Sequence, residues 1–188
     1  MSTSLLYHGW CLRGYDHFQT EYRGGVIRYH IRQRDELLAC PKCLSSKVVK
    51  RGTVRREIQT LPIGGRRVFL VLDVQRVECQ TCGCLRQGRL VFADERFHYA
   101  RAFERYALGL LQKMTVKDVA LHLGVGWDTI KEIQRRHLKR HYGKPKLKYL
   151  RLMAIDEIAI GAGHRYLTVV LNLETGAVVF VGEGKGAD

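Results

Sequence analysis

Two pairs of cysteines limit the possible folds of this chain more than any other feature. Cys40-Pro-Lys-Cys43 and Cys79-Gln-Thr-Cys82 are both Cys-x-x-Cys turns, and 35 residues separate them. Each turn can bind one metal ion through two thiolates, and two turns complete the tetrahedral Cys₄ shell of a structural zinc site. The spacing therefore predicts a closed zinc site at Cys40, Cys43, Cys79 and Cys82 that contributes to folding rather than catalysis.

Other interpretations of the cysteines stay open at the level of sequence. A Cys-x-x-Cys turn can be a redox pair, and free cysteines also pack as small apolar groups. Cys84 is an alternative ligand to Cys82, although the regular spacing favours Cys82. The chain shows no secretory signal and no apolar run long enough to span a membrane, which predicts a cytoplasmic protein. In a reducing compartment, paired cysteines bind metal more often than they form disulfides.

The stretch between the cysteine pairs predicts a β-hairpin. Apolar residues alternate with a period of two at Val68, Leu70, Leu72 and Val74. Pro62-Ile-Gly-Gly65 predicts a turn, so residues 47–61 and 66–77 are expected to pair. Such a hairpin accommodates the long spacing between the cysteine turns. Before the first pair, residues 26–32 alternate like a strand after Gly24-Gly25, and the role of residues 1–39 stays open.

Residues 116–133 match the pattern of a helix-turn-helix. We expect a short helix over residues 116–123, a turn at Gly124 and a longer helix from about residue 127 to 141. Ala120 is small where the helices would cross, and Gly124 permits the positive φ that the turn requires. An earlier helix, starting near Phe97, has one apolar face.

The second helix of this motif would lie in the major groove of DNA. The candidate residues for reading bases are Trp127, Asp128, Thr129 and Lys131. The candidate phosphate contacts are Arg135, Arg136, Lys139 and Arg140. The alternative is a plain helical hairpin whose charged face is only solvated.

Charge favours a polyanionic partner. The chain has 32 Lys and Arg against 18 Asp and Glu, for a net charge of +14. From residue 150 onward acidic residues outnumber basic ones, so the positive charge belongs to the part that contains the cysteines and the helices. A basic surface that only maintains solubility is the alternative.

The last part of the chain returns to strand patterns. Residues 149–156, 165–173 and 177–181 predict a three-stranded meander, with a tight turn at Glu174-Thr-Gly176. The first of these strands carries the adjacent carboxylates Asp156 and Glu157. Carboxylates at a strand end are suitable ligands for hard cations such as Mg²⁺.

The order of these parts resembles the DDE transposases of bacterial insertion sequences, and in particular the subfamily with an N-terminal zinc finger. The stretches Val116–Ile133, Ala154–Leu171 and Gly182–Asp188 carry the resemblance. It implies an α+β fold of several modules: a zinc-ribbon-like β module, an all-α helix-turn-helix and the first three strands of an RNase H-like α/β domain. The expected divisions are an N-terminal segment (1–39), the zinc-binding module (40–90), the helix-turn-helix domain (95–143), a basic linker (144–149) and the start of the catalytic domain (150–188).

The resemblance also implies a function in DNA transposition. The zinc finger and helix-turn-helix would bind double-stranded DNA at terminal inverted repeats, and a homodimer is compatible with this. Asp156 would be the first acid of a Mg²⁺-dependent DDE site that performs cleavage and strand transfer in the full-length family. Glu157 points to the opposite face of the strand and receives no role.

The second and third acids of the triad are expected on later elements, and Asp188 cannot be assigned as one of them. The resemblance therefore predicts a truncated transposase that is inactive alone and associated with the bacterial nucleoid. Two other functions stay open: a non-catalytic DNA-binding transcriptional regulator, and a zinc-ribbon protein that binds RNA or acts in translation.

Overall fold

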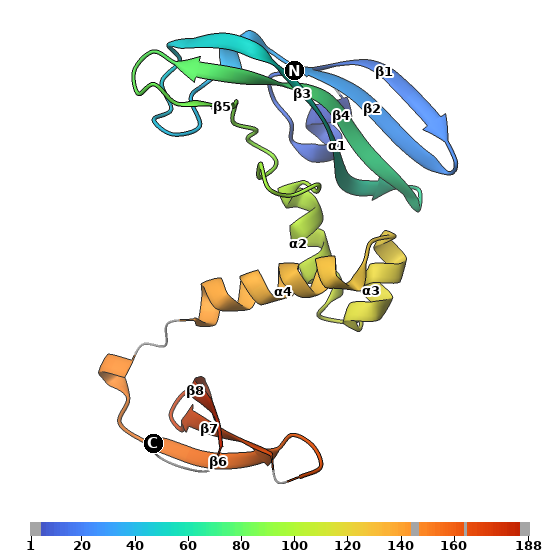
Figure 1. Cartoon of the computed structure of the whole chain (residues 1–188). Coiled ribbons are helices and arrows are strands. Elements are labelled where there is room, and N and C mark those ends of the chain that lie inside the picture. Colours follow the sequence, from blue (N-terminus) through green and yellow to red (C-terminus); the bar gives the residue numbers. More distant parts are fainter. Residues whose placement is uncertain (1–4, 144–146, 164, 185–188) are drawn as a thin grey trace. The chain divides into compact units, whose positions relative to one another are not determined.

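The computed structural model describes residues 5–143, 147–163 and 165–184 (Figure 1). Most of the predicted linker's basic residues and Asp188 lie outside these ranges. The chain divides into two compact units, Met1–Ile133 and Gln134–Asp188. Of the helices in the described ranges, none is both long and apolar enough to cross a membrane.

A five-stranded sheet is the largest secondary structure of the first unit. After helix α1 (Leu5–Trp10) come strands β1 (Tyr15–Arg23) and β2 (Val26–Gln33), and a 3-10 turn, η1 (Asp35–Leu37). The long strands β3 (Val48–Ile63) and β4 (Arg66–Cys79) follow, and then the short β5 (Leu85–Gln87). The strand order is β1-β2-β4-β3, and β5 pairs with β4. Strands β3 and β4 are antiparallel, which confirms the hairpin predicted from the alternating residues and the Gly64-Gly65 turn.

Residues before the first cysteine pair belong to the same sheet. Strands β1 and β2 form a second hairpin around Gly24-Gly25, whose two φ angles are both positive, as a tight two-residue turn requires. Strand β2 then runs parallel to β4, with Val26–His30 beside Arg67–Val71. One sheet therefore extends across the boundary expected at residues 39 and 40.

The core of this sheet follows from the period-two pattern. On β4, Val68, Leu70, Leu72 and Val74 are all buried, as their alternation predicts. They join Ile27, Tyr29 and Ile31 of β2 on the same face, where Leu6 and Trp10 of α1 cover them. The other face of β2 carries the polar Arg28, His30 and Arg32.

Three helices complete the first unit and confirm the predicted helix-turn-helix. They are α2 (Arg101–Leu110), α3 (Val116–Leu123) and α4 (Trp127–Tyr142), and α4 continues into the second unit. The first of them begins at Arg101 rather than near Phe97, because residues 93 and 98–100 bond to neighbouring strands and loops. Thr115 Oγ1 accepts the N–H of Asp118 and caps α3 at its start. Gly124 ends it with φ 63° and ψ 42°.

The buried side chains of these helices form one core. They are Phe103 and Ala107 of α2, Val119, Ala120 and Leu123 of α3, and Ile130 and Ile133 of α4. Ala120 is 4% exposed, so the small residue expected at the helix crossing lies inside the packed core.

Hydrogen bonds from Gln59 on β3 help to join the sheet to the helix-turn-helix. The N–H of Gln59 on β3 donates to His98 O, and its carbonyl accepts from the N–H of Ala100. Its side-chain Nε2 donates to Leu123 O over 2.9 Å. Gln59 is buried, so these bonds are shielded from water and fix the last turn of α3 against β3.

The second unit contains a three-stranded antiparallel meander. A 3-10 turn, η2 (Leu147–Tyr149), precedes β6 (Met153–Ala159), β7 (Tyr166–Asn172) and β8 (Val178–Glu183), in the order β6-β7-β8. The meander and its turn at residues 173–176 confirm the prediction. The first strand starts four residues later than expected, because the N–H of Leu150 closes the 3-10 turn on Leu147 O.

Candidate zinc centre and helix-turn-helix surface

The two cysteine turns have the same backbone geometry. In the first, the N–H of Cys40 donates to Ser45 O, and the N–H of Leu44 donates back to Cys40 O. In the second, the N–H of Cys79 donates to Cys84 O, and the N–H of Gly83 donates back to Cys79 O. Each turn thus holds its two cysteine side chains on the same side. Cys79 is the last residue of β4, so the hairpin brings the second turn to the first.

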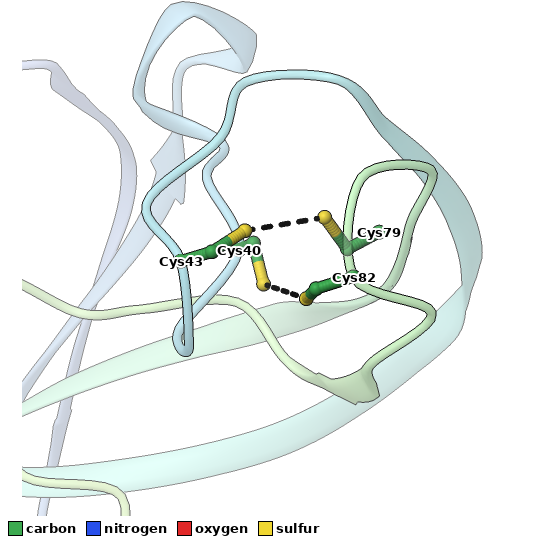
Figure 2. Close-up of side chains that lie close together, drawn as sticks. All are labelled: Cys40, Cys43, Cys79 and Cys82. Atoms are coloured by element: carbon green, nitrogen blue, oxygen red, sulfur yellow. Dashed lines mark hydrogen bonds between the residues drawn. The ribbon is translucent and has the colours of Figure 1, made fainter.

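The four sulfur atoms meet in one cluster (Figure 2). Cys40 Sγ lies 3.6 Å from Cys82 Sγ, and Cys43 Sγ lies 3.5 Å from Cys79 Sγ. All four sulfurs lie within 4.8 Å of one another. A tetrahedral zinc site with Zn–S bonds of about 2.3 Å has sulfur–sulfur separations of roughly 3.8 Å. The donor set and its dimensions therefore fit a Cys₄ zinc ion, and the cluster contains Cys82 rather than Cys84.

Hydrogen bonds make the first cysteine of each turn the more acidic one. The backbone N–H of Cys43 lowers the pKa of Cys40 to about 6. At Cys79, burial raises the pKa, but the N–H groups of Cys82 and Thr81 outweigh it and the net shift is downward. At Cys82, the N–H of Cys84 lowers the pKa, but burial and the other sulfurs raise it to about 12. A divalent cation would offset this repulsion between adjacent thiolates.

The helix-turn-helix presents the predicted DNA contacts on α4. Trp127, Asp128 and Lys131 are exposed near its start, and Thr129 is half-buried. Lys131 Nζ lies 4.8 Å from the centre of the Trp127 ring, a cation–π contact.

The second half of α4 belongs to the second unit. There Arg135, Lys139 and Arg140 are exposed, and Arg136 is half-buried. Residues 127, 131, 135 and 139 follow one another at intervals of four, so they form one slowly turning row along the helix.

Asp156 is exposed and lies in the middle of β6, where it pairs with Val169 of β7. The expectation that it ends the strand is wrong, because pairing with β7 continues to Ala159. Its Oδ1 accepts the backbone N–H of Glu157 over 2.8 Å. Within the described ranges, the four cysteines are the one group of three or more His, Cys, Asp or Glu side chains positioned to share an ion.

Comparison with protein families identifies both modules of the first unit. Residues 36–82 match the zinc-finger of transposase IS204/IS1001/IS1096/IS1165, and residues 90–138 match the helix-turn-helix domain of transposase family ISL3. Residues 36–138 thus contain the zinc-finger and helix-turn-helix region of an ISL3-family transposase. The ISL3 zinc-finger match includes all four clustered cysteines, and the ISL3 helix-turn-helix match includes α2, α3 and most of α4.

The curated relatives that the chain matches are also named transposases. The chain is 30% identical over 169 residues to the transposase for insertion sequence element IS1001 of Bordetella parapertussis. It is 27% identical over 164 residues to the transposase for insertion sequence element IS1557 of Mycobacterium tuberculosis. These matches cover 88% and 86% of this chain, but 41% and 37% of the respective relatives. No solved structure matches the chain.

Proposed function

We propose that this chain recognises the terminal inverted repeats of an insertion sequence as the DNA-binding part of a transposase. The observation that carries this proposal is the helix-turn-helix, in which α3 and Gly124 position an exposed, basic α4. In this function α4 lies in the major groove. Trp127, Asp128, Thr129 and Lys131 read base edges, while Arg135, Arg136, Lys139 and Arg140 bind phosphates. Such a protein acts on DNA of the bacterial nucleoid.

Zinc has a structural role in this proposal. Its ligands are Cys40, Cys43, Cys79 and Cys82. One cysteine turn precedes β3 and the other follows at the end of β4, so the zinc ion would link the two chain ends of the hairpin. Four protein ligands leave no open coordination position for a substrate, so the centre stabilises the sheet that carries the helix-turn-helix.

Asp156 is proposed as the first acid of a DDE site. Bound Mg²⁺ would activate a water or a 3′-hydroxyl and stabilise the leaving oxygen. The contribution of this chain is a single carboxylate on β6, and Mg²⁺ needs near-octahedral coordination by several oxygens. We therefore expect the 188-residue chain, assayed alone, to bind DNA without cleaving it.

Binding to short labelled duplexes tests the proposal. One duplex carries the inverted repeats that flank the coding sequence, and a control duplex contains the same bases in scrambled order. We expect zinc-loaded protein to prefer the repeats and to lose affinity steeply as salt rises, because phosphate contacts release counterions. Equal affinity for both duplexes would contradict recognition of the repeats. Binding confined to a promoter-proximal palindrome would indicate a transcriptional regulator instead.

Variants of α4 distinguish contacts with base edges from contacts with phosphates. Thr129→Val should reduce the preference for the repeats, since each lost base contact costs about 1–3 kcal/mol of discrimination. The double variant Lys139→Gln, Arg140→Gln should weaken binding to both duplexes equally. His122→Gln, an exposed change on α3, is the control. Removal of zinc by a chelator should abolish binding to either duplex together with the folded state of the cysteine turns.

A further inference from the structure

The turns of the two hairpins lie side by side at one end of the sheet (Figure 1). Arg23 of β1 pairs with Val26 of β2, and Val26 in turn pairs with Arg67 of β4. These three residues form one row across three adjacent strands. The backbones of Arg23 and Arg67 are therefore separated by two strand spacings, or roughly 10 Å. Arg66 is the first residue after the Gly64-Gly65 turn. We call Arg23, Arg66 and Arg67 the arginine edge.

The charge of the arginine edge is not neutralised by the protein. All three side chains are exposed. Among the described residues, no carboxylate lies within ion-pair distance of any of them. The neighbouring Arg28 differs, because its Nε donates to Glu57 Oε1 over 2.7 Å. The arginine edge is therefore a local concentration of positive charge without a carboxylate partner, which suits the binding of an external anion.

Hydrogen bonds place the arginine edge beside the helix-turn-helix within the first unit. Arg67 NH1 donates to Gly124 O over 3.2 Å, at the turn between α3 and α4. A Cβ on Gly124 would lie 2.6 Å from Arg67 Cδ, which shows how closely the arginine covers this turn. Gln59 of β3 pairs with Phe69, two residues after Arg67 on β4, and its side-chain bond to Leu123 O holds this part of the hairpin against α3. Arg67 thus lies at the turn that leads into the N-terminal end of α4.

We propose that the arginine edge binds phosphates of the same DNA duplex that α4 reads. This inference rests on the proposed function. Guanidinium groups bind phosphate oxygens with charge-assisted, paired hydrogen bonds, so exposed arginines without carboxylate partners suit a DNA backbone. Because Cys79 ends the strand that Arg66 begins, the zinc-binding sheet has two roles: it folds around the metal at one end and contacts DNA at the other.

The test compares two double variants that remove the same charge from the same sheet. Arg23→Gln, Arg66→Gln changes the arginine edge and keeps Arg67, which contacts the helix-turn-helix. Arg76→Gln, Arg86→Gln changes two exposed arginines near the zinc end of the sheet, on β4 and β5. Affinities for the flanking-repeat duplex and its scrambled control are measured at several salt concentrations. Far-UV circular dichroism and zinc content check that both variants fold.

We expect the arginine-edge variant to bind both duplexes about tenfold more weakly than the wild type, with the preference for the repeats unchanged. The slope of log affinity against log salt should fall by about 2, because each phosphate contact contributes about 0.9. The Arg76, Arg86 variant should retain the wild-type slope. Equal slopes in the two variants would overturn the inference while leaving the function of α4 intact. Failure of the wild-type chain to bind either duplex would instead overturn the proposed function and, with it, this inference.

Discussion

Leu44 has a backbone conformation that glycine adopts more easily. Its φ is 62°, and the corresponding residue of the second cysteine turn is Gly83 with φ 66°. A left-handed conformation costs an ordinary L-residue about 1–2 kcal/mol. The Leu44 side chain is 58% exposed, so it recovers little of that cost through burial. The backbone position is imposed by the bond from the N–H of Leu44 to Cys40 O, which closes the turn around the sulfurs.

Replacement of Leu44 by glycine should therefore stabilise the protein. We expect Leu44→Gly to raise the free energy of unfolding by about 0.5–1 kcal/mol, after the greater chain entropy of glycine is deducted. Urea denaturation at a fixed excess of zinc measures the change. Leu85→Gly is the matched control, since Leu85 is similarly exposed on β5 but has no left-handed backbone, and this change should destabilise. A destabilised Leu44→Gly would show that Leu44 is not left-handed in solution.

The sequence contains enough information to predict the cysteine cluster, but not the residues that support it. Two Cys-x-x-Cys turns at either side of a predicted hairpin must meet when the hairpin closes, so the convergence of the two turns could be predicted from spacing alone. The roles of Gln59 and Arg67 depend on residues 123 and 124, far along the chain. No local pattern marks a glutamine whose hydrogen-bond acceptor belongs to another module.

At the scale of elements, Gln59 determines how β3 holds the helix-turn-helix. We expect Gln59→Leu, which preserves size but removes the donor to Leu123 O, to cost about 1–3 kcal/mol of stability because a buried carbonyl loses its partner. Amide hydrogen exchange should also accelerate at Gln59 and Ala100, which bond across the same junction. Gln19→Leu, an exposed change on β1, is the control. Unchanged exchange at Ala100 would mean that the side chain of Gln59 does not hold this junction.

The predictable elements are those with a strong hydrophobic period. Strand β4 buries alternate valines and leucines, and α3 and α4 bury residues at helical spacing. Strand β1 was not predicted, because it lies at the sheet edge and only Tyr15 of its nine residues is buried. A polar edge strand lacks the alternation of apolar and polar residues by which a strand is predicted. The turn at Gly24-Gly25 was the one local indication of a hairpin there.

At the scale of the whole molecule, the parallel pairing of β2 with β4 could not be predicted from the sequence. Strand β2 precedes both cysteine turns and β4 lies between them, so their register depends on tertiary packing against α1 rather than on a local turn. The consequence is functional, because this register aligns Arg23 with Arg67. The arginine edge therefore exists only in the folded sheet.

The second unit exposes large apolar side chains on its meander. Ile155 is 65% exposed and Phe180 is 58% exposed, and Met153, Ile158, Val178 and Val181 are exposed as well. Apolar surface of this extent promotes association, and strands β6 and β8 each have one edge without a neighbour in the described sheet. The chain spans about two fifths of the length of its curated relatives.

We therefore expect residues 1–143 to behave as a better-defined protein than the 188-residue chain. The shorter chain should be monodisperse in light scattering and should bind little of a dye specific for exposed apolar surface, while the longer chain binds more dye and self-associates. DNA affinity should be unchanged within about twofold, because the proposed contacts all precede residue 143. The variant Ile155→Thr, Phe180→Thr in the 188-residue chain should reduce dye binding part-way. Equal dye binding by the two chains would show that the meander surface is covered in solution.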